Sequence, residues 1–397
     1  MKKALNTMKN LPDDKMNKKV YLNDVQAFLP NEAVSNKQIE SVLGQVGDRP
    51  SRAKNLILRS NQIKQRYYAI DPETGSTTHT NAQLTAEAIK RLNSDFFDIK
   101  EIELLACGTT IADQLLPNHA LMVHGELKIP SCEVVALAGI CLAGTMSLKY
   151  GYMSILSGQS SNAVVTGSEN ASAMMRAGQF EAEVSSKVEE LERQPEIAFE
   201  KDFLRWMLSD GAGAALLSNK KNDHGISLEI EWIEQKSYAN ELDACMYAGA
   251  EKLENGCLKG WREYSTQSWL DKSIFSVKQD VKQLNENIVE YTVTRPLRDL
   301  VTSGKVNPDE ITYFLPHYSS GYFRDRLYQG MLEANCDIPQ ERWFTNLSTK
   351  GNTGSASIYI ILEELFHSKQ LKVGDTLLCY VPESGRFSTA FMQLKVV

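Results

Sequence analysis

Short apolar segments alternate along the chain with amphipathic segments, as strands alternate with helices in an α/β protein. A half-buried strand alternates apolar with polar residues, and a strand buried on both faces is apolar throughout. A helix repeats its apolar positions about every 3.6 residues. By these patterns the predicted strands are residues 20–28, 103–106, 134–136 and 163–166, and the predicted helices are 81–92 and 143–156. Their order predicts a mostly parallel sheet with helices on both faces.

The same order of elements returns later in the chain, which indicates an internal duplication. The matched segments are 102–108 with 311–317, 129–130 with 338–339 and, with one residue added, 141–147 with 351–357. Chance similarity between two βαβ units is the alternative, but the ordered series of matches favours duplication. Two helix N-termini would then meet near a pseudo-twofold axis, one carrying Cys141 and the other Asn352.

Two irregular segments interrupt this repeat. Residues 178–203 are expected to be an insertion, within which 181–193 are strongly charged and are expected to form a solvated helical face. Residues 238–279 contain Trp261, Tyr264 and Trp269, for which ordinary packing is expected and a lid or an acyl channel is the alternative. The predicted organisation is a disordered tail at 1–19, an N-terminal half at 20–218 and a C-terminal half at 219–397.

Composition narrows the kinds of function that the chain can have. Among its 397 residues, 42% are hydrophobic and 23% are charged, which is ordinary for a globular protein with a sizeable core. The net charge of −7 gives no footprint for nucleic acid. The longest uncharged apolar run, 134–148, is shorter than the roughly 18 residues of a membrane-spanning helix, so no membrane span is expected.

The cysteines and the N-terminus indicate a cytoplasmic protein. Seven cysteines, with no Cys-x-x-Cys pair, argue against a disulfide framework or a zinc site and favour a reducing compartment. The N-terminal residues 1–19 contain several lysines but no apolar core, so they are not expected to be a signal peptide.

Three candidate functional residues stand at the ends of apolar segments. Cys141 opens a small-residue segment, His317 follows Pro316, and Asn352 lies between two glycines. A thiol at a helix N-terminus is expected to have a lowered pKa and to lie beside N–H groups that can bind an oxyanion. Taken singly, each has an ordinary structural explanation: a small buried thiol, a core histidine and a helix N-cap.

Taken together, the three residues indicate a site of acyl chemistry. In a Cys-His-Asn protease the histidine is the base for the cysteine. Two N–H donors directed at one oxygen suit an enolate instead, such as the one formed when a malonyl thioester loses CO2.

These segments resemble those of the β-ketoacyl-acyl-carrier-protein synthase III family of the thiolase superfamily, over nearly the whole chain. The matching features are Cys141 in its Ala-Gly-rich setting, His317 after Leu-Pro, Asn352 in Gly-Asn-Thr before Gly-Ser-Ala-Ser, Ser-Asp-Gly-Ala-Gly-Ala at 209–214 and Ile-Lys-Gln-Arg-Tyr at 63–67. The resemblance implies a thiolase-like α/β fold, with duplicated α-β-α-β-α layers and two mixed sheets around buried helices.

The resemblance also implies an acyltransferase with no cofactor and no metal. Cys141 would take an acyl group from a coenzyme A or acyl-carrier-protein thioester, whose oxygen the backbone N–H groups of Cys141 and Gly385 would hold. His317 and Asn352 would hold the thioester oxygen of a malonyl-type or β-ketoacyl donor, whose enolate attacks the acyl group. Leu116 matches a position that caps the partner subunit's acyl pocket, so a homodimer is implied.

The segment after His317 departs from the family pattern. Tyr-Ser-Ser follows the histidine, and Tyr322 stands where the family has an arginine linked to carrier docking. Arg324 and Arg326 are close by in the chain and are the candidates for carrier docking.

Two further departures bear on the substrate. The C-terminal loop 382–387 contains Glu383 and Arg386, which argue against a short acetyl primer. Segment 50–70 is similar to a bacterial branch found with dialkylresorcinol or aryl-polyene pathways, in which two elongated acyl chains are joined and the product cyclises.

Several alternatives stay open. They are a housekeeping fatty-acid initiation enzyme, an acyltransferase that esterifies alcohols or amines, and a hydroxymethylglutaryl-synthase-like enzyme with Glu169 as a base rather than a loop carboxylate. A non-catalytic partner subunit is disfavoured by the intact Cys-His-Asn set. A degradative thiolase is disfavoured because Cys379 is followed by Tyr-Val-Pro and not by the x-Gly of that class.

Overall fold

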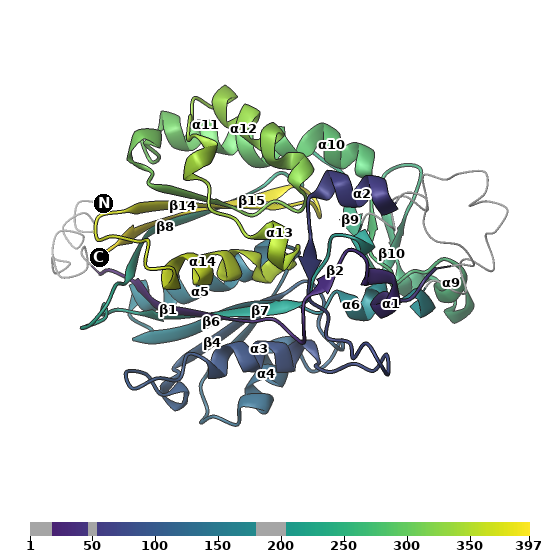
Figure 1. Cartoon of the computed structure of the whole chain (residues 1–397), viewed down its shortest axis with the longest axis horizontal. Coiled ribbons are helices and arrows are strands. Elements are labelled where there is room, and N and C mark those ends of the chain that lie inside the picture. Colours follow the sequence, from purple (N-terminus) through teal and green to yellow (C-terminus); the bar gives the residue numbers. More distant parts are fainter. Residues whose placement is uncertain (1–17, 47–53, 180–203) are drawn as a thin grey trace, which may run out of the picture.

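The computed structural model describes residues 18–46, 54–179 and 204–397, and these form five layers (Figure 1). Helices α3 and α4 cover one outer face, α5 and α14 fill the centre, and α10, α11 and α12 cover the other outer face, with strands between these layers. The bounds are α3 (Asn81–Lys90), α4 (His119–Leu127), α5 (Leu142–Ser157), α10 (Val281–Val289), α11 (Arg295–Thr302), α12 (Arg324–Glu333) and α14 (Ser357–His367). Residues 1–17 of the predicted tail lie outside the described residues.

Among the described residues, nine strands form one sheet that opens into two leaves. They are β1 (Tyr21–Phe28), β4 (Leu104–Thr109), β5 (Glu133–Ala138), β6 (Asn162–Glu169), β7 (Gly211–Ser218), β8 (Leu228–Ser237), β13 (Tyr313–Pro316), β14 (Thr376–Glu383) and β15 (Ser388–Val396), in the order β13-β14-β15-β8-β1-β7-β6-β4-β5. The leaves join where β1 pairs with β8, at Tyr21 with Glu229 and at Leu22 with Leu228. Beyond that hinge they diverge and hold α5 and α14 between them.

The prediction of a mostly parallel sheet is wrong, whereas that of mixed sheets is confirmed. Strand β4 is parallel to β5 and β6, and β13 is parallel to β14, but the other pairs in this sheet are antiparallel. The turn from β14 to β15 explains one reversal: Glu383 pairs with Ser388, so the chain returns through a tight hairpin and not through a crossover helix.

The two leaves have the same topology, which agrees with the predicted duplication of the fold. One leaf has the order β5-β4-β6-β7-β1, and the other has β13-β14-β15-β8, so that β4, β6, β7 and β1 correspond to β13, β14, β15 and β8. Trp343 forms a parallel bridge with Phe314 of β13 and takes the place that β5 has beside β4. The boundaries 20–218 and 219–397 stay a prediction.

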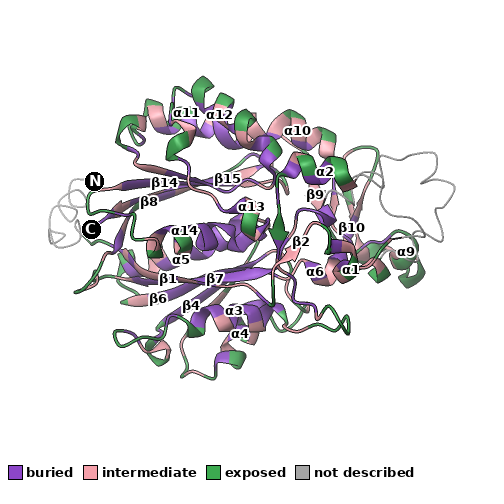
Figure 2. Ribbon diagram, viewed as in Figure 1, coloured by how far each residue is buried: buried purple, intermediate pink, exposed green. Residues whose placement is uncertain are grey.

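Small residues allow the central layer to pack closely. Helix α14 is buried over its first six residues, in keeping with its apolar sequence there (Figure 2). A Cβ at Gly144 of α5 would lie 2.2 Å from the backbone oxygen of Ser355, so only glycine fits at this contact. Across the same contact the Tyr359 hydroxyl donates to the Gly144 carbonyl oxygen over 2.8 Å.

The irregular segment 238–279 folds into short elements beside the open end of the two leaves. They are β9 (Met246–Tyr247), β10 (Ala250–Lys252), β11 (Leu258–Gly260), α9 (Thr266–Asp271) and β12 (Lys278–Gln279). Trp261, Trp269 and Phe275 form an aromatic cluster with ring centroids 5.6–5.9 Å apart. The charged helical face predicted at 181–193 lies outside the described residues, as does most of the predicted insertion at 178–203.

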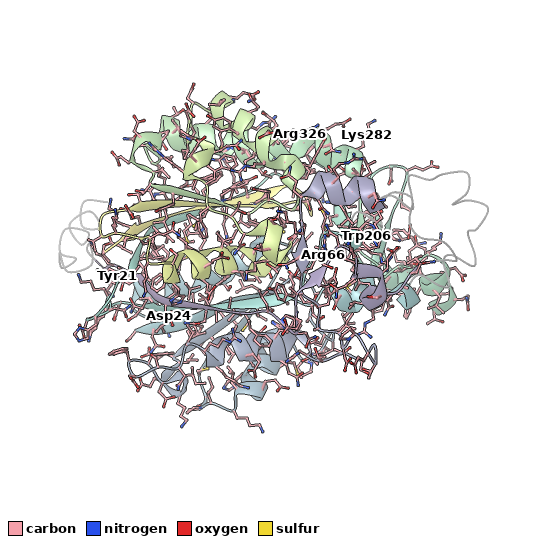
Figure 3. All side chains as sticks on the ribbon, in the orientation of Figure 1. Tyr21, Asp24, Arg66, Trp206, Lys282 and Arg326 are labelled. Atoms are coloured by element: carbon pink, nitrogen blue, oxygen red, sulfur yellow. The ribbon has the colours of Figure 1, made fainter. Side chains whose placement is uncertain are left out.

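The other short elements lie next to this segment. They are β2 (Val34–Ser35), α1 (Ile39–Leu43), α2 (Lys54–Asn61), β3 (Gln65–Arg66), α6 (Ser172–Met175) and α13 (Leu347–Lys350). Arg66 is fully buried beside Trp206 (Figure 3), where Nη2 donates to the Trp206 carbonyl oxygen over 2.6 Å. This bond fixes the segment that leads into β7.

Candidate active site

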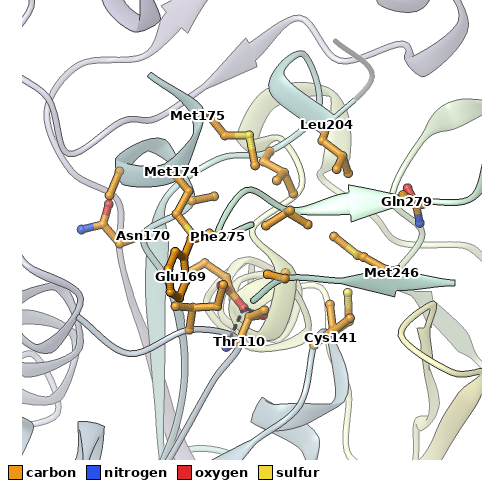
Figure 4. A pocket seen from close by; sticks show the side chains of 18 of the residues that line it. Thr110, Cys141, Glu169, Asn170, Met174, Met175, Leu204, Met246, Phe275 and Gln279 are labelled. Carbon is orange, nitrogen blue, oxygen red and sulfur yellow. Dashed lines mark hydrogen bonds between the residues drawn. The ribbon is translucent and has the colours of Figure 1, made fainter. Parts of the chain in front are cut away.

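A cavity of about 510 Å³ is lined by Cys141, which is labelled in Figure 4, and by Asn352, from the starts of the two central helical segments. Its walls are mainly apolar and include four methionines. The apolar and aromatic lining residues are Ile111, Ala112, Leu115, Ile140, Ala171, Ala173, Met174, Met175, Leu204, Met207, Leu208, Met246, Ala248, Trp261, Phe275 and Val277. The volume and the lining are typical of a pocket for an elongated apolar ligand.

Cys141 stands at the N-cap of α5, directly after the turn that follows β5. It is partly exposed, and this exposure is toward the cavity that it lines. Burial of the thiol raises the pKa of Cys141, and the nearby carboxyl groups of Glu169 and Glu383 raise it further. The expectation of a lowered pKa is therefore wrong, because desolvation and two like charges outweigh the helix N-terminus.

Asn352 is held with its amide N–H2 group free. Its Oδ1 accepts a hydrogen bond from the Gly354 N–H over 3.0 Å, so the Nδ2 donors point away from that turn. The Asn352 backbone is fixed by Met207 and Ser209, through bonds of 3.1 and 2.8 Å. Gly351 has a φ of +74°, and a Cβ there would lie 2.8 Å from Cβ of Ser209, so glycine is required next to this asparagine.

The two motifs at 63–67 and 209–214 support the Asn352 loop. Asp210 is buried and accepts bonds from the backbone N–H groups of Ala69 and Ser172, at 2.6 and 2.8 Å. Burial raises the pKa of Asp210 to about 6, against the lowering effect of these bonds. Both motifs are thus structural parts of the site rather than groups that line the cavity.

His317 directly follows β13 and is 3% exposed. Its backbone N–H donates to the Tyr380 carbonyl oxygen over 2.8 Å. Burial lowers the pKa of His317 to about 4, so the ring is neutral at pH 7 and carries one N–H donor. His317 is not among the described cavity-lining residues, but Ser319, two positions later, is.

Glu383 is bonded to the backbone on both sides of Cys141. Its Oε2 accepts from the N–H groups of Ile140 and Leu142, at 2.9 and 3.3 Å. Gly385 lies in the same loop, where a Cβ would lie 2.9 Å from Cδ1 of Ile140. Within the described residues, the N–H groups of Cys141 and Gly385 have no hydrogen-bond partner. The loop that carries Gly385 lies against Ile140, the residue before Cys141.

Glu169 is a polar group in the cavity wall. From the sequence, it could be either a base or an ordinary loop carboxylate. It ends β6 and is 8% exposed. Its Oε1 accepts from the N–H of Ser355 over 3.0 Å and from the N–H and hydroxyl of Thr110 (Figure 4). Burial raises the pKa of Glu169 to about 7 despite these bonds. In the sequence, the signal that could have pointed to Glu169 is its position at the end of an apolar strand, after Gly-Ser.

The remaining candidates differ in their accessibility. Leu116 is 85% exposed, and the neighbouring Leu115 lines the cavity. Arg324 is engaged inside the protein, where its guanidinium binds the side chain of Gln340 over 2.8 Å and the Tyr318 hydroxyl over 3.1 Å. Arg326 is exposed and lies 4.4 Å from the ring centre of Tyr322.

Residues 238–279 contribute a wall of the cavity, beyond the ordinary packing that was expected. Trp261 and Phe275 line it together with Met246. The described residues contain no group of three or more His, Cys, Asp or Glu side chains that could hold a metal ion. In the same part of the chain, no helix is long and apolar enough to cross a membrane.

Comparison with known proteins places this site in a class. Residues 301–389 match the family model of the 3-oxoacyl-[acyl-carrier-protein] synthase III C-terminal domain. The β-ketoacyl-[acyl-carrier-protein] synthase III of Clostridium perfringens (strain SM101 / Type A) is 25% identical over 354 residues, which cover 88% of this chain and 91% of that protein. The enzyme of the same name from Sulfurovum sp. (strain NBC37-1) is 23% identical, over 89% of each chain.

Solved structures show the same fold. The tetronic acid condensing enzyme AbyA1 has a TM-score of 0.71 at 19% identity, over 95% of this chain and 99% of that one. The Aquifex aeolicus 3-oxoacyl-[acyl-carrier-protein] synthase III has a TM-score of 0.67, at the same identity and coverage. Xanthomonas campestris OleA, solved with lauric acid and lauroyl-CoA, has a TM-score of 0.67 at 16% identity, over 95% of this chain and 99% of that one.

The fold and these relatives define a condensing acyltransferase with the thiolase fold. Within that class, the chain is similar to the β-ketoacyl-acyl-carrier-protein synthase III family, whose C-terminal domain model matches residues 301–389.

Proposed function

We propose that this enzyme transfers an acyl group to Cys141 and then joins it, in a Claisen condensation, to a malonyl-type or β-ketoacyl thioester. The observation that carries the proposal is the shared cavity, in which Cys141 and Asn352 meet between apolar walls. A thiol next to unpaired backbone donors and an amide donor across an apolar pocket are the parts that acyl storage and enolate stabilisation require.

In the first step the Cys141 sulfur attacks the thioester carbonyl carbon, and the oxygen gains negative charge. The N–H groups of Cys141 and Gly385 bind that oxygen. The raised pKa of Cys141 keeps the thiol protonated in the resting enzyme. Its proton leaves with the thiol of coenzyme A or of the carrier protein.

In the second step His317 and Asn352 bind the thioester oxygen of the donor as it becomes an enolate. The lowered pKa of His317 supports this role, because the neutral ring donates without adding a positive charge. Asn352 contributes its Nδ2 donor, since Oδ1 is occupied by Gly354. The enolate carbon then attacks the acyl carbon on Cys141 and releases the thiolate.

The acyl group is elongated, and the pathway is the formation of a dialkylresorcinol-type product in lipid or polyketide-type secondary metabolism. The methionine-rich cavity wall supports an apolar chain, since methionine side chains adapt to irregular ligands. OleA, whose solved structure contains lauric acid and lauroyl-CoA, provides a precedent for such ligands on this fold.

The enzyme is a homodimer that pairs through β5. This strand is apolar in sequence yet exposed or half-exposed along its length. Its sheet position gives it one hydrogen-bonded neighbour among the described strands, β4. Leu116, exposed on a loop that lines the cavity, reaches the partner subunit's acyl pocket in this arrangement.

The carrier protein docks on the outer helices α10 and α12. Arg326 and Lys282 are exposed there, on two helices that contact one another (Figure 3). Exposed cations attract an acidic carrier surface. Arg324 has a structural role instead, because Gln340 and Tyr318 already bind its guanidinium.

Mass spectrometry of the intact protein tests the proposal. After incubation with acyl-CoA or acyl-carrier thioesters, we expect one added acyl group on the protein and none on the Cys141→Ala variant. Cys379→Ala is a matched control, since this buried cysteine in β14 is not among the cavity-lining residues. Acylation of the Cys141→Ala protein would overturn the assignment.

A further inference from the structure

Glu169 combines three properties that a proton acceptor for carbon needs. It lines the cavity that also contains Cys141 and Asn352, it is surrounded mainly by apolar groups, and it has one oxygen without a partner. The bonds from Thr110 and Ser355 all go to Oε1. Among the described residues, none donates a hydrogen bond to Oε2, and the residue lines the cavity.

The same turn positions Glu169 and Asn352. The Gly354 N–H binds Oδ1 of Asn352, and the next N–H, that of Ser355, binds Oε1 of Glu169. Two consecutive backbone donors thus orient a hydrogen-bond donor and a hydrogen-bond acceptor toward one space. In a thioester the carbonyl oxygen and the α-hydrogen belong to adjacent carbons, so one bound donor can meet both groups.

The charges around the cavity disfavour a donor that carries a carboxylate. The charged side chains among the described lining residues are those of Asp113 and Glu169, and no lysine or arginine lines the cavity. Glu383 adds a third carboxyl group beside Cys141. A malonyl carboxylate would be desolvated near like charges with no cation to pair with, and that is unfavourable.

We propose that Glu169 Oε2 takes the α-proton of a donor thioester that has no α-carboxylate, such as a 3-oxoacyl thioester, so that the condensation releases no CO2. This inference rests on the proposed function. The C–H electron pair becomes the enolate, whose oxygen Asn352 binds, and the enolate carbon forms the new C–C bond with the acyl carbon on Cys141. The C–S bond to Cys141 breaks, and the proton on Glu169 passes to the departing thiolate.

Single-turnover kinetics on enzyme whose Cys141 is already acylated test this role. With a 3-oxooctanoyl carrier thioester, we expect product without CO2 in the unsubstituted enzyme. The Glu169→Gln variant should lose about 100- to 10,000-fold in this rate, the usual contribution of a positioned base. Its acylation by an acyl thioester should stay within a few fold, and this also shows that the variant folds.

Glu364→Gln is the matched control. Glu364 is another carboxylate of the central layer, on α14, and it accepts a hydrogen bond from Nδ2 of Asn346 over 2.8 Å. Glu364 is not among the described cavity-lining residues, so its variant should keep the condensation rate with the 3-oxoacyl donor. Glu169→Asp should recover part of the rate.

The outcomes separate this inference from the proposed function. If the unsubstituted enzyme is not acylated at Cys141, the proposed function fails and this inference fails with it. If acylation is normal but Glu169→Gln condenses the 3-oxoacyl donor as fast as the unsubstituted enzyme, the base role alone is overturned. Product formed only from a malonyl donor, with release of CO2, would overturn it as well.

Discussion

The two halves of the molecule share one topology, but the starts of their central helices differ. In the N-terminal half, α5 begins directly after Cys141, and the N–H groups on both sides of the thiol bind Glu383. In the C-terminal half, a turn at Gly354–Ala356 separates Asn352 from α14, and its N–H groups bind Asn352 and Glu169. The duplicated scaffold thus places the Cys141 thiol at one helix start and the Asn352 amide at the other, and a carboxylate from the opposite half binds the backbone of each.

The largest expected effect distinguishes the roles of the two helix starts. Cys141→Ala should abolish acylation and product together. Asn352→Ala should leave acylation intact and lower the condensation rate by about 100- to 1,000-fold, the usual loss for one oxyanion donor. Intact-protein mass spectrometry and single-turnover product analysis measure the two steps separately.

Asn346→Ala is the control for the second variant. Asn346 is another buried asparagine of the same half, and its Nδ2 donates to Glu364 over 2.8 Å, away from the cavity. Equal loss of condensation in both asparagine variants would show that the effect is structural.

The next effect concerns the edge strands of the two leaves. In β5 the Glu133 N–H donates to Glu103, so N–H groups of alternate residues point to β4 and that of Ala136 points away from it. Ala136→Pro should therefore keep β4 paired with β5 but convert the proposed dimer into a monomer. Size-exclusion chromatography with light scattering measures this, and Ala136→Ser, which keeps the N–H, should stay dimeric.

The pH dependence of the condensation rate tests which carboxyl group acts as the base. A base must be ionised, and burial raises the pKa of Glu169 to about 7. Condensation of the 3-oxoacyl donor by acylated enzyme should therefore rise about tenfold per pH unit below pH 7 and become level above it. The slow residual condensation rate of the Glu169→Gln variant should not show this dependence on pH.

Several other groups near Glu169 do not titrate in this range. The acyl group blocks Cys141, and burial keeps both His317 and His119 neutral, each with its pKa lowered to about 4. Burial raises the pKa of Asp210 to about 6 and also raises the pKa of Glu383, so the curve is assigned to Glu169 by its loss in the Glu169→Gln variant. A profile that Glu383→Gln changes and Glu169→Gln does not would reverse the roles of the two carboxyl groups.

A smaller effect concerns the thiol itself. The Glu383 carboxylate raises the pKa of Cys141, so Glu383→Gln should lower it and increase alkylation of Cys141 by iodoacetamide severalfold at pH 8. Peptide mass spectrometry follows the modification at this one cysteine. In the Glu87→Gln variant, which changes a residue on the outer surface of α3, Cys141 should be alkylated at the same rate as in the unsubstituted enzyme.

The smallest effect concerns the contact between the two central helices. Tyr359→Phe removes the bond to the Gly144 carbonyl oxygen and should lower the free energy of unfolding by about 1 kcal/mol. Urea denaturation measures this change. Tyr21→Phe, at the half-exposed start of β1, should have no measurable effect on the free energy of unfolding. An equal loss of stability in that variant would show that the Tyr359 bond makes no specific contribution.

Much of the fold was predictable because it depends on local pattern. The strands around 103–106 and 163–166 and the helix at 143–156 are confirmed with small changes of boundary, since burial and small residues mark them. Strand direction was not predictable in the same way. Strand β7 is buried along nearly its whole length, and such an apolar segment looks alike in a parallel or an antiparallel sheet.

The environment of the site was harder to predict than its residues. Cys141 was proposed from its setting, but its raised pKa depends on burial and on Glu169 and Glu383, which lie at the ends of two strands distant in sequence. The aromatic wall at Trp261 and Phe275 depends on how an irregular segment folds back over the cavity. Neither the raised pKa nor the aromatic wall can be predicted from the local pattern of apolar and polar residues.

The unequal edges of the sheet also limit how far this protein can assemble. At one edge Trp343 bridges to Phe314, and the Phe344 N–H donates to Phe314 over 2.9 Å, so β13 is already covered. At the other edge β5 is open. Two copies that meet through β5 use up both open edges, because each offers one. In the proposed dimer, growth by strand pairing therefore ends at two copies and does not continue into a filament.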